Sequence, residues 1–481
     1  MAKPTLSVSG YRGIWGDSLT PEIAIRFAKA FAMFTKANHR SDLWTDSEKQ
    51  TTLGPTYGAT ILIGRDGRES GPTISSAIIP ELEKLGINVI YGDLLPTPTM
   101  ILACKKYKYD GGIIITASHN PIEYNGLKFI TKDARLTNEE ERDSIKRNFE
   151  TPLLSEEGAG GGDSNEGHPL ALNGHSPFAG GENFIKEHVD EILKHIDVEA
   201  IRARKFKVAV DMINASACAV DPYLFEQLGA TLIPINNIPN GKFAHRPEPV
   251  KENLEGICEL VKDSGADIGF AHDPDADRLV IINEKGEYIS EEYTLGFGIE
   301  AVLSKNPGRN VVINMSTSQM SADITENHGG KCFRTKVGEA NVFAGIDEHN
   351  AIIGGEGGSG CIYPTINNCR DGFVSLSLAL ELLAKRNQTV SELVESLPKY
   401  FMKKDKFSIE GKNMEELYQK LKSKFPDGKI NELDGLRLDF PNQSWIHIRP
   451  SITEPIVRFF GEAKTQSEID ALFAAAKSAI A

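Results

Sequence analysis

The chain has 481 residues, of which 40% are hydrophobic and 25% charged, and its formal net charge is −14. This length exceeds what one hydrophobic core supports and predicts roughly three or four domains of an ordinary globular protein. The negative charge argues against a nucleic-acid-binding surface, and no stretch reaches the roughly 18 apolar residues of a membrane span.

The N-terminus, MAKPTLSVSGYRG, lacks the apolar core of a signal peptide. Six cysteines occur and none forms a CxxC pair, which argues against a zinc site. They are also too sparse for a disulfide framework in a chain of this size. We therefore expect a reducing, cytoplasmic setting.

The first predicted helix spans Pro21–Phe34, with Thr20 as its N-cap and a proline at the first helical position. Two later segments, 38–57 and 151–182, are polar and lack apolar periodicity, and the second is also rich in Gly and Ser. Such composition buries too little apolar surface to order well, so both are interpreted as insertions or linkers. We place the first domain boundary near the second of them.

Short apolar runs alternate with amphipathic segments through most of the chain, which favours βαβ units and mostly parallel sheets. Six of these runs form three pairs, and each run ends in a loop of small and polar residues. The pairs are 61–68 with 111–120, 208–216 with 266–278, and 311–319 with 351–360. This spacing predicts three similar α/β modules in series. Ligands collect at the carboxyl ends of strands in open α/β sheets, so the three second-strand loops can face one shared cleft.

The chain from about residue 401 onward has a different pattern. It contains a helix pattern at 414–425, strand patterns at 435–440 and 444–450, and a final helix pattern at 467–481. We therefore predict an α/β protein with three tandem α/β domains of mixed, mostly parallel sheets and a smaller C-terminal α+β domain, arranged around a central cleft. The predicted domains span 1–165, 166–290, 291–400 and 401–481.

The first loop with chemical character reads TASHNP, from Thr116 to Pro121, and follows an apolar strand. Ser118 lies between small and polar neighbours, so its hydroxyl can be exposed. A serine nucleophile needs a base or an electrophilic environment, which His119 and Lys128 can supply. Turns favour these residue types in any case, so this loop alone does not establish a function.

The second loop, HDPDADR, places Asp273, Asp275 and Asp277 at alternate positions. Three carboxylates on one side of an extended turn suit a hard cation, Mg²⁺ or Ca²⁺. The spacing to Glu284 also resembles an EF-hand, but Arg278 stands where that loop needs glycine, and the flanks have strand patterns instead of helix patterns. A solvated acidic turn is the remaining alternative, and the apolar strands on both sides argue against it.

Two later loops have the composition of binding loops. GGEGGSG at 354–360 lets the backbone approach a ligand, and Glu356, its only charged residue, can accept hydrogen bonds from hydroxyl groups. RPSITEPIVRFFGEA can form a phosphate cradle from two arginines and two hydroxyls, those of Arg449, Arg458, Ser451 and Thr453. Each of these two loops, taken alone, is also compatible with an ordinary solvated turn.

Together and in this order, the four loops resemble those of the α-D-phosphohexomutase superfamily, and the resemblance covers nearly the whole chain. It implies four domains around a central cleft and an active serine that carries a phosphoryl group. It also implies an isomerase that interconverts hexose 1-phosphate and hexose 6-phosphate through a hexose 1,6-bisphosphate, which turns around in the site. The implied substrate is a sugar phosphate, and the implied cofactors are Mg²⁺ and hexose 1,6-bisphosphate as an activator.

The resemblance further implies roles for individual residues. Ser118 would be the phosphoserine. Its phosphate would hold Mg²⁺ together with three carboxylates, those of Asp273, Asp275 and Asp277. Proton transfer and phosphate contact near the serine would involve His119, Lys128 and Arg12. Substrate binding would involve residues of the metal loop, the TKVGEANV run, the sugar loop and the phosphate loop, namely Arg278, Lys336, Glu339, Glu356, Ser359, Arg449, Ser451, Thr453 and Arg458.

The chain departs from the family pattern in three places. Ile452 occupies the middle of the phosphate loop, where glycine or asparagine is usual, and Gly358 replaces a common serine or asparagine of the sugar loop. NASA at 214–217 replaces the commoner NGAG. The runs TKVGEANV and SGYRGIWG resemble those of archaeal- and Bacteroidetes-type enzymes, which are named phosphoglucosamine mutases or phosphomannomutase/phosphoglucomutases.

Two other functions are compatible with the same loops. A sugar phosphatase or phosphotransferase would use the same phosphoserine, and activation by a sugar bisphosphate would distinguish a mutase from it. A non-catalytic sugar-phosphate-binding relative would lack a serine, an aspartate or an arginine of the site, whereas Ser118, the aspartate triad and the phosphate-loop arginines are all present. The sequence does not select the hexose, the oligomeric state, the phosphorylation state of the serine or the pathway.

Overall fold

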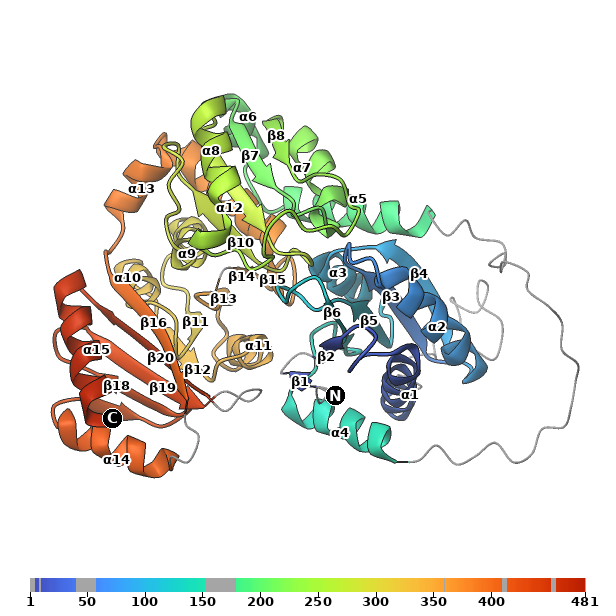
Figure 1. Ribbon diagram of the computed structural model, residues 1–481. Coiled ribbons are helices and arrows are strands. Elements are labelled where there is room, and N and C mark those ends of the chain that lie inside the picture. The colour runs from blue at the N-terminus through green and yellow to red at the C-terminus, as the bar shows by residue number, and fades with distance from the viewer. Residues whose placement is uncertain are drawn as a thin grey trace, which may run out of the picture.

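The computed structural model describes residues 5–7, 10–39, 58–151, 179–358, 360–408, 413–450 and 456–480. The two segments interpreted as linkers lie largely outside these ranges. Six residues of the predicted binding loops also lie outside them, namely Ser359 and residues 451–455. The described chain forms three α/β modules followed by a C-terminal antiparallel module (Figure 1).

The first module is built on a six-stranded sheet. Its elements are β1 (Thr5–Ser7), β2 (Gly10–Ile14), α1 (Pro21–Ala37), β3 (Thr60–Arg65), α2 (Gly71–Lys84), β4 (Asn88–Leu94), α3 (Thr97–Tyr107), β5 (Gly111–Ile115), β6 (Tyr124–Ile130) and α4 (Glu139–Glu150). The predicted first helix is confirmed as α1 and extends to Ala37. At its start the Ile23 N–H donates to Thr20 Oγ1, as expected for an N-cap.

The second module has a four-stranded sheet and the third a five-stranded sheet. The second contains α5 (Ala179–Leu193), α6 (Val198–Arg204), β7 (Lys207–Asp211), η2 (Ser216–Ala219), α7 (Asp221–Leu228), β8 (Thr231–Ile235), η3 (Lys251–Asn253), α8 (Glu255–Ser264), β9 (Ile268–His272) and β10 (Leu279–Ile282). The third contains α9 (Glu292–Lys305), β11 (Val311–Asn314), α10 (Gln319–Asn327), β12 (Cys332–Thr335), α11 (Glu339–Glu348), β13 (Ile353–Gly355), β14 (Cys361–Ile362), β15 (Arg370–Asp371), α12 (Gly372–Arg386) and α13 (Val390–Ser396).

The three α/β modules share one strand order, so the predicted repeat is confirmed. The repeated orders are β4-β3-β5-β6, β8-β7-β9-β10 and β12-β11-β13-β14. In each, the first strand in sequence pairs in parallel with the next two, and the last strand is antiparallel. The serine, metal and sugar loops therefore follow the equivalent strands β5, β9 and β13.

The fourth module has an all-antiparallel sheet of five strands. Its elements are β16 (Phe401–Ser408), α14 (Met414–Lys424), β17 (Lys429–Asn431), β18 (Leu436–Asp439), β19 (Trp445–Pro450), β20 (Ile456–Ala463) and α15 (Gln466–Ile480), with strand order β16-β20-β19-β18-β17. Both helices pack on this sheet, because Leu421 of α14 and Phe473 of α15 join Leu438 and Phe459 in one buried cluster. The predicted α+β character of this part is confirmed.

One buried apolar cluster runs through the first three modules and holds them together. On β3, Leu62 faces this cluster, whereas Ile61 and Ile63 face a separate cluster beneath α1 and α2. This alternation follows from the two-residue period of a strand. Because the modules share a core, the loop after β5 meets the loop after β9. Among the described residues, no helix is long and apolar enough to cross a membrane.

Candidate active site

Ser118 lies in the loop after β5 and reaches into the second module. Its Oγ donates a hydrogen bond to Asp273 Oδ2 at 2.9 Å, across 155 residues of sequence. His119 Nδ1 lies 3.4 Å from the same Oγ. The Ser118 backbone has a φ of +50°, a left-handed conformation that residues other than glycine seldom adopt. The two loops that carried the strongest sequence predictions are therefore in direct contact.

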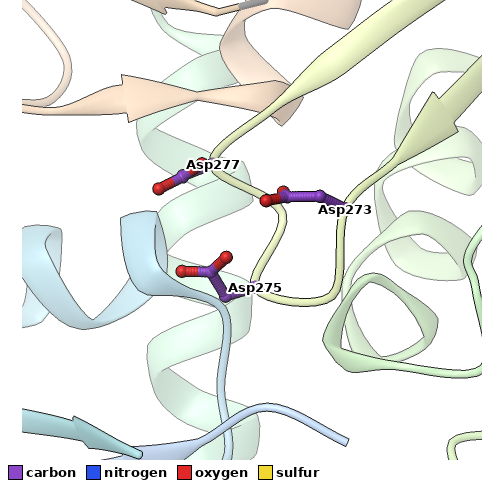
Figure 2. A group of neighbouring side chains, drawn as sticks. All are labelled: Asp273, Asp275 and Asp277. Atoms are coloured by element: carbon purple, nitrogen blue, oxygen red, sulfur yellow. The ribbon is translucent and has the colours of Figure 1, made fainter. Parts of the chain in front are cut away.

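The aspartate triad forms a compact acidic group between β9 and β10 (Figure 2). Asp273, Asp275 and Asp277 are fully buried, and each offers a carboxylate oxygen within 4.8 Å of the other two. Among the described residues, Asp275 Oδ1 and Asp277 Oδ1 have no hydrogen-bond partner. Buried orphan carboxylate oxygens in a three-carboxylate group fit a hard divalent cation. The flanking strands confirm that this is not an EF-hand.

Lys128, on β6, is the nearest cation to the triad. Its Nζ lies 2.5 Å from Asp275 Oδ2 and 2.8 Å from Asp277 Oδ2. Burial alone would lower the pKa of Lys128, but these two carboxylates outweigh it and raise the pKa, so the lysine stays charged. Thr97, at the start of α3, adds a hydrogen bond from its Oγ1 to Asp275 Oδ2 at 2.5 Å.

The pKa of Asp273 and the pKa of Asp277 shift in opposite directions. Burial, followed by the carboxylates of Asp277 and Asp275, raises the pKa of Asp273 well above its ordinary value. Burial also acts to raise the pKa of Asp277, but Arg370 and then Lys128 outweigh it and lower the pKa. The protein's own cations therefore neutralise the Asp277 side of the triad, and the Asp273 side, next to the serine, favours an added positive charge.

Arg370, on β15, links the metal loop to the sugar loop and was not among the predicted residues. Its Nη2 lies 3.2 Å from Asp277 Oδ2, its Nε 2.9 Å from Glu339 Oε2, and its Nη1 3.4 Å from Glu356 Oε2. No local pattern indicated this role, because Arg370 precedes an Asp-Gly pair that is typical of an ordinary turn. One buried guanidinium thus binds three carboxylates from two modules.

The sugar-loop glutamate is held in place by the backbone and side chains of the third module. Glu356 Oε1 accepts hydrogen bonds from Asn314 Nδ2 at 2.8 Å and the Gly338 N–H at 2.7 Å. Glu339, at the start of α11, is buried, and its Oε1 has no hydrogen-bond partner among the described residues. Burial first, then the nearby Asp277, raises the pKa of Glu339 to about 7 despite the opposing Arg370.

Two arginines, Arg12 and Arg278, bind the serine loop and the metal loop beside Ser118. Arg12 donates from Nη1 to Asn120 Oδ1 at 2.7 Å, which ties β2 to the serine loop. The Arg278 N–H donates to Asp273 Oδ1 at 3.0 Å, and its side chain is partly exposed. Burial, then the charges of Arg278 and Arg12, holds the pKa of His119 well below its ordinary value, so its imidazole is neutral.

The predicted phosphate-loop arginines face each other on adjacent strands. Arg449 of β19 and Arg458 of β20 are cross-strand partners, and Lys406 of β16 pairs with Arg458 on its other side. Burial lowers the pKa of Arg449, while the carboxylates of Asp434 and Glu356 oppose that shift. These cations form a basic row that a phosphate can neutralise.

The structure brings most predicted residues into one connected group. Ser118, His119, Lys128, the triad, Arg278, Glu339 and Glu356 are joined by direct contacts or through Arg370. Lys336 is exposed, and within the described part of the chain no side-chain hydrogen bond or ion pair joins it to this group. Ser359, Ser451 and Thr453 fall outside the described residues.

Three family models match the chain in succession. They describe the phosphoglucomutase/phosphomannomutase alpha/beta/alpha domain I over residues 4–155, domain II over 186–286 and domain III over 291–401. These matches follow the three α/β modules in order.

Similar proteins match over nearly their whole length. A phosphoglucomutase/phosphomannomutase from Thermococcus kodakarensis is 35% identical over 461 residues, which cover 95% of this chain and 94% of that protein. A phosphoglucosamine/phosphogalactosamine mutase from Sulfurisphaera tokodaii is 31% identical over 464 residues, 95% of each chain. The crystal structure of a phosphoglucomutase/phosphomannomutase family protein from Burkholderia thailandensis is 25% identical, with a TM-score of 0.78 over 98% of this chain and 97% of that one. This chain therefore belongs to the phosphoglucomutase/phosphomannomutase family of the α-D-phosphohexomutase superfamily, a family of isomerases.

Proposed function

We propose that this enzyme interconverts hexose 1-phosphate and hexose 6-phosphate by way of a phosphoryl group on Ser118 and a hexose 1,6-bisphosphate intermediate. The observation that carries this proposal is the hydrogen bond of Ser118 Oγ to Asp273, inside a buried carboxylate triad. A serine hydroxyl directed at a cation site has the arrangement that phosphoryl transfer needs, because that reaction depends mainly on positioning and charge neutralisation.

Asp273, Asp275 and Asp277, together with the phosphate on Ser118, would hold Mg²⁺. When bound, this ion would neutralise charge on the phosphoryl oxygens and polarise the phosphorus. Two observations support the assignment: the donor set is all carboxylate, and two of its buried oxygens have no protein partner among the described residues.

Each transfer exchanges one P–O bond for another. The bond from Ser118 Oγ to phosphorus breaks as a sugar hydroxyl oxygen forms its own bond to the same phosphorus; the sugar hydroxyl loses a proton, and Ser118 Oγ takes one up to become a hydroxyl again. In the reverse direction the serine proton leaves, and His119 Nδ1, 3.4 Å from Oγ, lies within reach of it. The Lys128 ammonium and the Arg12 guanidinium stabilise negative charge at this end of the site.

The sugar and its second phosphate would be bound by the third and fourth modules. Glu356 would accept hydrogen bonds from sugar hydroxyls, with Glu339 beside it. Arg449 and Arg458 would bind the phosphate that is not being transferred, with Arg278 and Lys336 as further contacts and the outlying Ser359, Ser451 and Thr453 completing the loops. The bisphosphate would turn by about half a turn between transfers, and exclusion of water would protect the phosphoserine meanwhile.

Glucosamine, glucose and mannose phosphates are the candidate substrates, and hexose 1,6-bisphosphate is the candidate activator. We also propose domains at 1–165, 166–290, 291–400 and 401–481, which is supported by the fact that each of the four sheets lies within one of these ranges. The six cysteines are free thiols, which supports a reducing, cytoplasmic setting.

A coupled mutase assay tests the proposal. Glucose, mannose and glucosamine 1-phosphates are offered separately, each with Mg²⁺ and a trace of the matching 1,6-bisphosphate, and Ser118→Ala is the control. We expect turnover of at least one sugar that disappears in the Ser118→Ala enzyme and depends on the bisphosphate. Release of free phosphate without the 6-phosphate product would instead indicate a phosphatase, and no turnover of any sugar would refute the mutase assignment.

A further inference from the structure

Arg68 is a buried arginine that uses every one of its donors on fixed partners. A guanidinium has five N–H groups in a planar fork. These reach Asp66 Oδ2 at 3.1 Å, Pro121 O at 2.7 Å, Tyr124 O at 2.8 Å, Ser118 O at 2.7 Å and Asn120 O at 2.7 Å. Only 1% of the side chain is exposed, so no donor is left for a substrate. Three of the four carbonyls belong to the loop that carries the proposed nucleophile, and the fourth is that of Tyr124, the first residue of β6, which follows the loop.

The carboxylate that anchors Arg68 also anchors the start of the serine loop. Asp66 Oδ1 accepts from the Arg68 N–H at 3.0 Å, and Asp66 Oδ2 accepts from Thr116 Oγ1 at 2.6 Å. Thr116 Oγ1 in turn accepts from the Ser118 N–H at 2.8 Å. Asp66, Arg68 and Thr116 therefore hold the Ser118 peptide from both its N–H and its carbonyl.

This restraint matters because the Ser118 backbone is strained. A φ of +50° is unfavourable for a residue with a Cβ and persists only where the surroundings over-determine it. Without the bonds from Arg68, the serine loop could relax to an ordinary turn, and its Oγ would no longer be directed at Asp273. The strain is thus held where the reaction needs a fixed hydroxyl.

Arg68 also lies against the second module, which supplies the metal loop. The guanidinium stacks over the Phe243 ring, with its carbon 4.9 Å from the ring centroid. Gly241 packs so closely on the Gly67 carbonyl that a Cβ at Gly241 would lie 2.2 Å from that oxygen. Arg68, which fixes the serine loop, is therefore also in contact with the module that carries the aspartate triad.

We propose that Arg68 is a positioning residue for phosphoryl transfer: it fixes the serine loop so that Ser118 Oγ stays directed at the carboxylate triad. This inference rests on the proposed mutase function and adds to it a residue that contacts no substrate. Arg68 acts on the transfer step, whereas sugar phosphate binding depends on Glu356, Arg449 and Arg458, which it does not touch. Its loss should therefore lower kcat and leave KM unchanged.

The test is Arg68→Lys in the full-length enzyme, assayed with the hexose 1-phosphate that the wild type turns over fastest. Lysine keeps the charge but has three donors on a single nitrogen, which cannot span four carbonyls and a carboxylate. A displacement of about 1 Å at the reacting atom costs about 100-fold, so we expect kcat to fall by about that factor. Phosphorylation of Ser118 by glucose 1,6-bisphosphate, followed by intact-protein mass spectrometry, should slow equally.

Arg65→Lys is the matched control. Arg65 is the last residue of β3 and lies three residues before Arg68; it is partly buried and pairs with Asp93 instead of the serine loop, its Nε lying 2.7 Å from Asp93 Oδ1. This variant should keep the wild-type kcat. If Arg68→Lys does not fold, Asp66→Asn carries the test, because it weakens the anchor of Arg68 while keeping its shape. It should lower kcat in the same direction with KM unchanged.

Wild-type kcat in a folded Arg68→Lys or Asp66→Asn enzyme would overturn the inference. A loss confined to KM, or an equal loss in Arg65→Lys, would overturn it as well. These failures are distinct from failure of the proposed function, in which the wild-type enzyme and Arg65→Lys would show no mutase turnover at all.

Discussion

Replacement of Arg370 by leucine should destabilise the centre of the protein strongly. The guanidinium is buried and pairs with Asp277, Glu339 and Glu356 at nitrogen–oxygen distances of 3.2, 2.9 and 3.4 Å. Leucine fills part of the volume but leaves three carboxylates facing one another without this cation. Removal of one member of a buried ion pair costs about 3–5 kcal/mol, mainly because the remaining charge is left unpaired.

Thermal unfolding of the metal-free enzyme measures this cost. For a cooperative unit of 150–250 residues, each kcal/mol shifts the midpoint by about 2–4 °C, so we expect Arg370→Leu to lower Tm by roughly 6–20 °C. Lys146→Leu, which breaks an exposed pair with Glu150, is the control and should leave Tm almost unchanged.

A second substitution tests the cause of the loss. Glu356→Gln removes one of the unpaired charges, so the double variant Arg370→Leu/Glu356→Gln should recover part of the lost Tm. The reasoning would be refuted if Arg370→Leu unfolded at the wild-type temperature. It would also be refuted if Glu356→Gln lowered Tm further in the Arg370→Leu background, since the loss would then come from packing instead of charge.

Three further outcomes are expected. Chelation with EDTA should abolish mutase turnover, with recovery on added Mg²⁺, and Asp275→Asn should raise the Mg²⁺ concentration needed for half-maximal turnover, because a neutral amide binds the cation less well. Burial raises the pKa of Glu292 from 4.5 to about 8, so the wild type loses stability as pH rises through that window. Glu292→Gln removes this loss, and its Tm advantage over wild type should be larger at pH 8 than at pH 5. Thr97→Val should lower Tm modestly and weaken Mg²⁺ activation, because it removes a buried hydrogen bond to Asp275; unchanged titrations would contradict that link.

Local pattern was sufficient to predict most of the scaffold. The six apolar runs became the paired strands of three modules because a buried parallel strand needs a continuous apolar segment, which is legible without tertiary information. The helix after Thr20 followed from its cap and proline. The strands β1 and β2, which extend the first sheet through antiparallel pairing with β6, were not predicted. The five residues of β2, Gly10–Ile14, are too short a segment to reveal that their partner strand, β6, lies more than a hundred residues away.

The candidate site was also predictable only in part from the sequence. The sequence by itself determined the types of residue present: a serine loop, three alternating aspartates, a glycine-rich loop with one glutamate, and two arginines in a late strand pair. It also determined that the first three loops follow equivalent strands, since the spacing of the repeat is a local property of the chain.

Only the tertiary structure decided which of these groups form ion pairs with one another and which other residues fix their positions. Arg370 pairs with Asp277 across 93 residues, and Arg68 binds the Ser118 carbonyl across 50. Neither residue belongs to a distinctive motif, because an arginine before a turn is common on protein surfaces. A buried arginine differs from a surface one, because a guanidinium removed from water must donate its hydrogen bonds to acceptors within the protein. The packing of the modules determines which carbonyls and carboxylates lie within reach of it.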